Sequence, residues 1–319
     1  MMRRDRNFPD LNLALSLAGI ISLLTCYSSP ALARELTGET LTIDATTPVD
    51  TYALNANSIL TIDAAQTDSI QSHSSSLNML SGTTTTTAGT AITLVDSVAT
   101  IANAAISTSG NGFGLALARQ NIASTATVTN SQLSGGIAGA QATAGSQLTI
   151  QGSQLTGTRP TGVGLRLLGG NATIIDSTVT GQASGIRLLL EGAVNREPEL
   201  TLDNARVIGL NGPAISVGAN TDATVQVSNG STLTGSNGVA ISVAGASTLT
   251  GLVDDSVLTG GVTIADQAAG DLQFSNSQVD GHFEIGGTLD ASFEESSLNG
   301  NLNVNDSGVA TVEFSNAAT

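Results

Sequence analysis

The sequence has no lysine and no tryptophan, and it contains one cysteine in 319 residues. Charged residues make up 11% of the chain and aromatic residues 3%, both low for a globular protein. Hydrophobic residues still reach 40%, which is too apolar for a disordered chain. The composition therefore argues against both a disordered chain and an ordinary two-domain enzyme, and it indicates that apolar residues are buried in many small portions.

Positive charge is scarce throughout. Ten basic residues, all of them arginine, face 26 acidic residues, which gives a formal net charge of −16. From Val207 to the end there are twelve acids and no basic residue. Such acidity favours solubility, excludes a nucleic-acid binder and disfavours attraction to an anionic membrane surface.

The first 33 residues predict a secretory signal peptide. Three arginines precede an apolar run from Leu11 to Leu24, and Ala31-Leu32-Ala33 supplies the small residues of a cleavage site. The apolar run is too short for a retained membrane anchor, which is therefore disfavoured. A lipoprotein acylated at Cys26 is also disfavoured, because Thr25 fits poorly at the position before the cysteine. Cleavage after Ala33 leaves residues 34–319 without a disulfide or a thiol nucleophile.

The remaining chain repeats one pattern. Leu41–Ala45 returns as Leu60–Ala64, and fuller units such as Leu148–Gly157 and Ala172–Gly181 share one frame. That frame alternates apolar and polar residues, bends at Asn, Asp or Gly, usually has Ser soon after, and closes on Gly. A second alternating run, such as Ala214–Val217, lies between frames. Period-two alternation without a helical period predicts an all-β chain.

The bend position carries the most information about architecture. Nine of its ten residues are Asn, Asp or Gly, which tolerate a positive φ, and Glu295 departs. Their spacing averages about 24 residues and varies, as expected for a solenoid whose loops differ in length. The ten positions are Asp96, Asn130, Gly152, Asp176, Asn204, Asn229, Asp254, Asn276, Glu295 and Asn316.

These features predict a single-stranded, right-handed parallel β-helix of about twelve coils over residues 34–319. Phe274, Phe293 and Phe314 occupy one inward position in consecutive units, so we expect them to stack. A sandwich or closed barrel would instead require hairpin turns and regularly spaced strands. Residues 65–90 are ambiguous between irregular turns and a loose loop.

A signal peptide followed by such units, with stretches like Ala240–Gly251, resembles the pertactin-like passenger domains of bacterial autotransporters. The resemblance covers the chain from about residue 90 onward and rests on the repeated sequence pattern more than on a unique motif. It implies a surface-displayed or shed β-helix, exported through the outer membrane by a C-terminal barrel and often acting as an adhesin. The sequence has no Arg-Gly-Asp tripeptide, so integrin-type attachment is not carried over.

No barrel strands and no proline-rich linker follow the repeats, and the chain stops inside a unit without a polar capping turn. We therefore expect a truncated or split passenger, whose outer-membrane barrel translocator is missing from this chain. A free-standing periplasmic protein is the alternative.

Catalytic chemistry has little support. Asp254-Asp255 and Glu294-Glu295 are the only adjacent carboxylate pairs, about 40 residues apart, whereas polysaccharide-cleaving β-helices gather several acids on one face. Arg166 and Arg187 lie in corresponding strands and form an outward basic step, which we expect to be solvated or matched to nearby glutamates, Glu191 and Glu197. We predict no catalytic residue.

Metal and cofactor sites are also not predicted. His73 and His282 each lack a second His or Cys nearby, and no phosphate-binding loop occurs. Calcium at the acids of the last hundred residues is an alternative with oxygen ligands but no known spacing.

One exposed threonine column raises the further alternative of an ice-binding face. Such a face needs flat paired ranks, whereas this column changes character along the chain, so we interpret the threonines as exposed strand residues. The column runs Thr127, Thr149, Thr173, Thr201, then Gln226, Gln273, Ser292 and Glu313.

The sequence thus predicts a non-enzymatic, secreted or surface-displayed autotransporter passenger that is adhesin-like. Its alternative is a secreted polysaccharide-active β-helix, a pectinase-like lyase or hydrolase. The expected partner is an extracellular surface or matrix ligand, contacted by loops at residues 193–199 and 152–164, because insertions concentrate on one corner of a solenoid. We expect the protein at the cell surface, the outer membrane or outside the cell, and in the periplasm if the barrel is truly absent.

Overall fold

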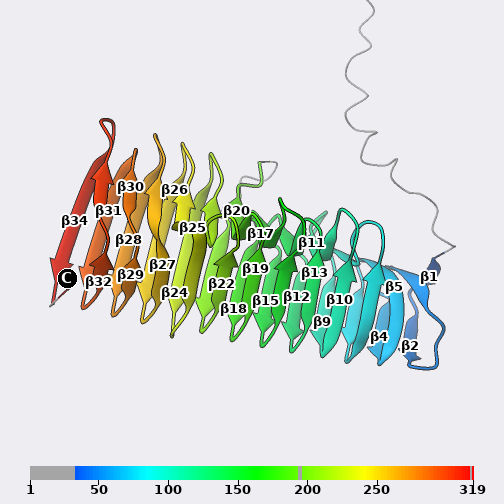
Figure 1. The fold of residues 1–319 in the computed structure, drawn as a ribbon. Helices are drawn as coiled ribbons and strands as arrows, with labels where there is room; N and C mark the ends of the chain where they lie inside the picture. Colours follow the sequence, from blue (N-terminus) through cyan, green and yellow to red (C-terminus); the bar gives the residue numbers. More distant parts are fainter. Residues whose placement is uncertain (1–32, 193–195, 317) are drawn as a thin grey trace, which may run out of the picture.

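The computed structural model describes residues 33–192, 196–316 and 318–319, and within them it contains 34 strands and no helix. All ladders between named strands are parallel, and they build two sheets that wind along one axis (Figure 1). The predicted parallel β-helix is confirmed. The predicted signal peptide lies outside the described residues except for Ala33, and the first strand begins at Arg34.

The smaller sheet, called sheet B here, has 13 strands. They are β2 (Thr40–Asp44), β4 (Ile59–Asp63), β6 (Ser76–Met79), β9 (Val98–Ala102), β12 (Thr125–Thr129), β15 (Gln147–Gln151), β18 (Asn171–Ile175), β21 (Glu199–Asp203), β24 (Asp222–Ser228), β26 (Thr248–Asp254), β28 (Ala269–Ser275), β31 (Thr288–Glu294) and β34 (Val309–Ser315).

The larger sheet, called sheet A, has 21 strands. They are β1 (Arg34–Thr37), β3 (Asp50–Asn55), β5 (Ala65–His73), β7 (Gly82–Thr86), β8 (Ile92–Val95), β10 (Ala104–Thr108), β11 (Phe113–Ala118), β13 (Gln132–Gly135), β14 (Ala138–Thr143), β16 (Gln154–Gly157), β17 (Val163–Leu168), β19 (Thr178–Gly181), β20 (Ser184–Leu189), β22 (Arg206–Gly209), β23 (Ile215–Val217), β25 (Thr232–Val243), β27 (Val257–Ile264), β29 (Gln278–Asp280), β30 (Phe283–Ile285), β32 (Ser297–Asn299) and β33 (Leu302–Val304).

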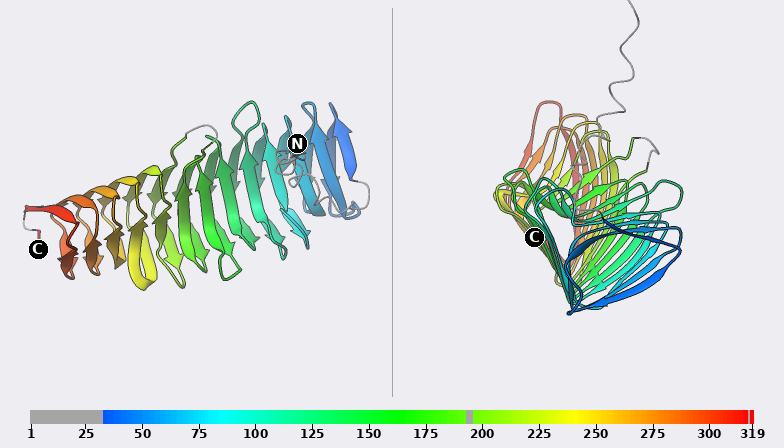
Figure 2. Two further views of the ribbon diagram at one scale, coloured as in Figure 1. Left: turned by 90° about the horizontal axis from the view of Figure 1, so that it is seen from above. Right: turned by 90° about the vertical axis from the view of Figure 1, so that its right-hand side faces the viewer.

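Each full turn gives one strand to sheet B and either two strands or one long bent strand to sheet A. Three corners follow: the bend corner leads from sheet B to sheet A, the middle corner lies within sheet A, and the return corner leads back to sheet B. Seen along the axis, the stacked turns form a wedge (Figure 2). The chain makes about 13 turns, one more than predicted, because the first turns are short: Leu41 pairs with Leu60, and Leu60 with Leu77.

The core is a set of apolar columns along the axis. Inward residues at one position of sheet B pair turn by turn, from Ile150 and Ile174 to Phe274 and Phe293. The predicted phenylalanine stack is confirmed, with ring centroids 4.6 Å apart between Phe274 and Phe293 and 5.0 Å apart between Phe293 and Phe314. Because the interior is narrow and each column takes one side chain per turn, few large aromatic residues are needed to fill it.

The bend corner has positive φ in the predicted column, with two corrections. The left-handed residue after β26 is Asp255, not Asp254, because β26 extends through Asp254. Asp96 also has a positive φ, but it follows β8 at the return corner, and Asn103 holds the bend position of that turn. Glu295 adopts φ 50° although its residue type disfavours it.

Residues 65–90, which the sequence left ambiguous, form regular strands. β5, β6 and β7 pair with their neighbours in both sheets. The run of threonines enters sheet A, where the buried hydroxyls of Thr67 and Thr84 lie 2.8 Å apart. At this one position, a hydrogen bond between stacked threonines therefore takes the place of an apolar contact.

The serine that follows most bends is buried and forms a ladder along the axis. Ser131 N–H donates to the Ser153 hydroxyl, and Ser153 N–H to the Ser177 hydroxyl, each at 3.0 Å. The Ser177 hydroxyl in turn donates to the carbonyl of Ile175 at 2.6 Å. Each hydroxyl thus satisfies a backbone N–H that the bend leaves without a strand partner. This role explains why the repeat keeps Ser at that position.

Candidate functional surface

The outer face of sheet B carries the threonine column that the sequence predicted. Thr127, Thr149, Thr173 and Thr201 pair directly in successive turns. The column also extends upstream through positions that the sequence analysis missed, although the repeated Leu-Thr-Ile-Asp segments contained the signal. These upstream members are Thr42, Thr61, Asn78 and Thr100.

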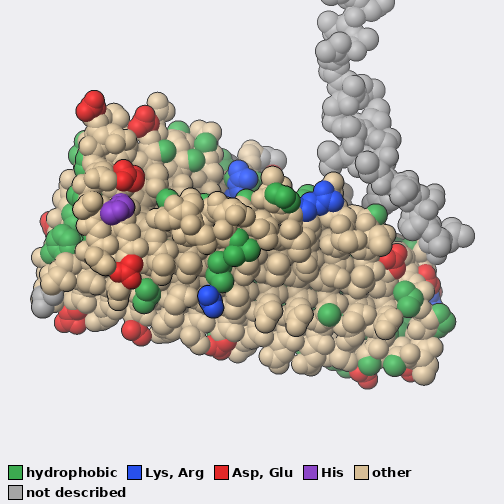
Figure 3. Space-filling view, viewed as in Figure 1, with side chains coloured by type: hydrophobic (Ala, Val, Ile, Leu, Met, Phe, Trp, Pro, Cys, Tyr) green, Lys and Arg blue, Asp and Glu red, His purple; other side chains and the backbone are tan. Residues whose placement is uncertain are grey.

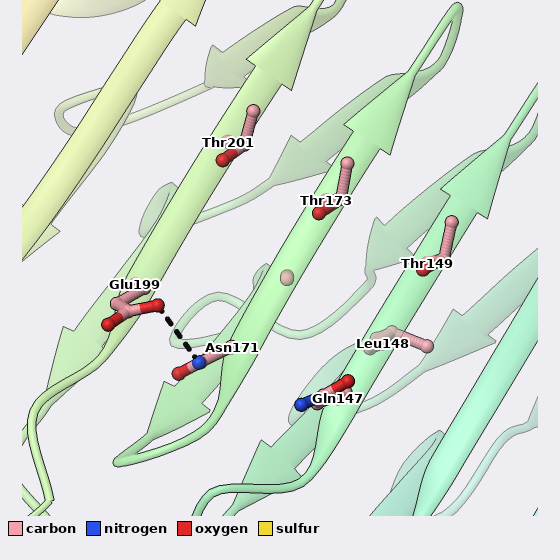
Figure 4. Close-up of a pocket in the computed structure, with 8 residues that line it drawn as sticks. Gln147, Leu148, Thr149, Asn171, Thr173, Glu199 and Thr201 are labelled. Carbon is pink, nitrogen blue, oxygen red and sulfur yellow. Dashed lines mark hydrogen bonds between the residues drawn. The ribbon is translucent and has the colours of Figure 1, made fainter.

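A shallow hollow lies on this face where β15, β18 and β21 meet (Figure 4). A second outward column, Gln147, Asn171 and Glu199, runs beside the threonines. The Asn171 side-chain amide donates to a Glu199 carboxylate oxygen at 3.1 Å. We call these two columns across the three strands the sheet-B face. Its hydroxyl, amide and carboxylate groups repeat at the rung spacing of roughly 4.8 Å, so it can donate and accept hydrogen bonds along an extended ligand.

The two acid pairs lie on separate turns. Asp255 and Glu295 share the bend corner, with Asn276 between them. Two rungs separate their backbones by roughly 9–10 Å. Glu294 accepts a hydrogen bond from the Asn316 side chain at 2.6 Å, which is a contact within the corner. One acid of each pair, Asp255 and Glu295, therefore lines the same open hollow at the bend corner.

Both histidines lie at corners of the solenoid. His73 is exposed at the end of β5, and the Nδ1 of His282 accepts the backbone N–H of Asn301 at 3.0 Å. Among the residues that the structure describes, no group of three His, Cys, Asp or Glu side chains lies close enough to hold a metal ion. Nor does any helix in that part of the chain suffice to span a membrane.

The predicted basic step is present. Arg166 on β17 pairs with Arg187 on β20, and both side chains point outward from sheet A. Burial lowers the pKa of the Arg166 guanidinium, the neighbouring Arg187 charge lowers it further, and Glu191 raises it in part. On the face shown in Figure 3, the arginine side chains lie over the middle of the rod. The same middle turns also carry acids, among them Asp176, Glu191 and Glu199.

Insertions project from two corners of the solenoid, whereas the sequence analysis expected them at a single corner. Residues 158–162 lie at the middle corner, and residues 119–124, 190–192 and 196–198 lie at the return corner. The predicted loop 152–164 contains β16, so only its central part is irregular. Residues 193–195 of the other predicted loop lie outside the described residues, and Glu199 already belongs to β21.

Asp96 anchors the first return-corner loop. Its carboxylate accepts backbone N–H groups of Gln120 at 2.7 Å, Asn121 at 2.9 Å and Ile122 at 3.2 Å. Burial raises the pKa of Asp96, but these hydrogen bonds outweigh it and hold the pKa below 3.8. The carboxylate therefore stabilises the fold above its unfolded pKa of about 3.9, and that contribution disappears as the pH falls through the lower folded value.

We expect the Asp96→Asn variant to be less stable than the parent at pH 7. Between pH 5 and pH 2 its stability should fall by less than that of the parent, because the titrating carboxyl group is absent. Urea unfolding across this range measures both effects. Asp306→Asn, at an exposed position, serves as the control and should follow the parent. Parallel curves for Asp96→Asn and the parent would rule out the anchoring role.

Fold and surface together define a class, the parallel β-solenoid with a polar outer sheet. When the chain was compared with known proteins, no family model, no curated protein and no solved structure matched it.

Proposed function

We propose that the chain is a non-enzymatic passenger of the pertactin-like autotransporter type, secreted or displayed at the cell surface, where it acts in an adhesin-like manner. The sheet-B face is its main contact surface, and an extracellular surface or matrix ligand is its partner. The repeated sequence pattern and the predicted signal peptide support export as an autotransporter passenger, and the parallel β-helix is compatible with that route.

The observation that carries this proposal is the regular polar surface of the rod. Thr149, Thr173 and Thr201 stand in line beside Gln147, Asn171 and Glu199, in an open hollow rather than an enclosed pocket. Such a face offers many weak hydrogen bonds to an extended partner and excludes little water from any one point. Asp255 and Glu295 are the only acids among the described residues that line the bend-corner hollow. A polysaccharide-cleaving β-helix is expected to gather three or more acids on one face, so the small number of acids favours the adhesin-like role.

A charge placed on the sheet-B face tests the proposal. We expect Thr149→Glu with Thr173→Glu to reduce adherence of producing cells to their target surface at least tenfold, because two carboxylates would join Glu199 and repel an acidic or densely polar partner. Adherence of intact cells, counted after washing, is the measurement. Protease shaving of the same cells should remove the parent and the variant equally.

The matched control is Thr156→Glu with Thr180→Glu, an equivalent pair of adjacent outward threonines on sheet A. It should leave adherence unchanged. Equal loss in both pairs would point to general charge repulsion and contradict a role for the sheet-B face. Resistance of the parent to shaving, with release by osmotic shock, would contradict surface display.

A further inference from the structure

Three successive turns of sheet A carry an unusual concentration of positive charge in an otherwise acidic rod. Gln141 on β14, Arg166 on β17 and Arg187 on β20 stand in one outward column, each paired with the next. We propose that this column binds a tetrahedral oxyanion, a sulfate or phosphate group. The proposal is independent of any adhesive role of the sheet-B face.

Two more arginines lie at the corners beyond the two ends of β14. The Arg159 side chain lies over Gly136 at the middle corner, and the Arg196 side chain lies over Gly145 at the return corner. Of the seven arginines in residues 34–319, four therefore surround strands β14, β17 and β20. We call Gln141, Arg159, Arg166, Arg187 and Arg196 the arginine step.

The central pair is only partly neutralised. Arg166 is half-buried, and the repulsion from Arg187 acts on it more strongly than the attraction of Glu191. The backbone N–H of Glu191 donates to the carbonyl of Arg196 at 3.3 Å, so Glu191 lies at the return corner of these turns. Two like charges held one rung apart destabilise each other unless an anion lies between them. A bound dianion would remove that repulsion.

Gln141 supplies an independent sign of an incomplete site. Its Oε1 atom is buried and has no hydrogen-bond partner among the residues that the structure describes. It stands one rung before Arg166, whose guanidinium has five N–H donors. An N–H of Arg166 that turned to this oxygen would fix the guanidinium plane and leave the other donors free for a ligand. A buried acceptor without a partner is unfavourable, so a ligand that favours this arrangement of Arg166 would also satisfy the Gln141 oxygen.

The spacing of the pair indicates a tetrahedral group. Backbones one rung apart are separated by roughly 4.8 Å, so two guanidiniums can approach one anion from different sides. A sulfate or phosphate offers three or four acceptor oxygens in different directions and can bond both forks. A planar carboxylate fills a single fork and leaves the second arginine unpaired.

Isothermal titration calorimetry on the protein recovered from producing cells tests the proposal, with inorganic sulfate, inorganic phosphate, acetate and a sugar sulfate monoester as probes at constant ionic strength. We expect sulfate or phosphate to bind and acetate to bind at least tenfold more weakly. Arg166→Gln and Arg187→Gln should each weaken oxyanion binding at least tenfold. Gln141→Met should weaken it less, because it removes orientation rather than charge.

The control is Arg206→Gln on β22, an exposed arginine outside the step, which should bind as the parent does. Circular dichroism and thermal unfolding check that each variant keeps the fold. Binding of the sugar ester as tightly as the free ion would indicate a group carried on a larger molecule, and binding of the free ion alone would indicate the ion itself. The absence of binding by the parent, or equal binding by the two central arginine variants, would overturn the proposal.

Discussion

Gly181→Ala is expected to destabilise the solenoid strongly, by about 3 kcal/mol. Gly181 ends β19 at the middle corner, where a methyl group would collide with the carbonyl oxygen of Ser184 and lie 2.7 Å from the backbone nitrogen of Gly164. Both obstacles are backbone atoms, so a side-chain rotation cannot relieve the clash. The same glycine recurs in five consecutive turns, at Gly135, Gly157, Gly181, Gly209 and Gly235, each against a carbonyl of the next strand or loop.

Urea unfolding followed by circular dichroism measures this loss. The matched control is Gly192→Ala, because a methyl group there meets no atom of the described residues within 4 Å. We expect the control to change stability by less than about 0.5 kcal/mol. Similar losses in the two variants would show that lost glycine flexibility, rather than the close approach at the middle corner, sets the effect.

Phe293→Ala should cost about 3–5 kcal/mol, the usual range for removing a buried aromatic ring. The Phe293 side chain is fully buried and stacks between Phe274 and Phe314, with Phe283 tilted against it at 6.1 Å. Because the strand ladders hold successive rings of this column at a fixed spacing, neighbouring turns cannot collapse into the cavity without breaking those ladders.

Two further variants sharpen this expectation. Phe314→Ala should cost less than half as much, since that ring is 49% exposed. Phe293→Leu should recover most of the loss, because Leu202 occupies the same column in an earlier turn. If Phe293→Ala lost no more stability than Phe314→Ala, the result would contradict tight packing of Phe293 within the phenylalanine column.

Several features of the fold follow from the residues of one unit alone. Alternation of apolar and polar residues predicts which side chains point inward, and Asn, Asp or Gly predicts the bend. The phenylalanine stack and the adjacency of Arg166 and Arg187 could be predicted because equivalent residues of equivalent units must meet in a solenoid. These properties depend on local chemistry that repeats.

Other features required the register between turns, which hydrogen bonds and packing set across roughly 20 residues of intervening chain. The sequence by itself determined an all-β solenoid, its inward columns and its recurrent bend. The tertiary structure alone decided that Asp255 rather than Asp254 takes the left-handed bend and that Asp96 anchors a loop at another corner. It also decided that insertions project from two corners and that Gln141, whose side-chain oxygen has no partner among the described residues, lies one rung from Arg166. The physical reason is that strand pairing, not proximity in the chain, selects the neighbours in adjacent turns.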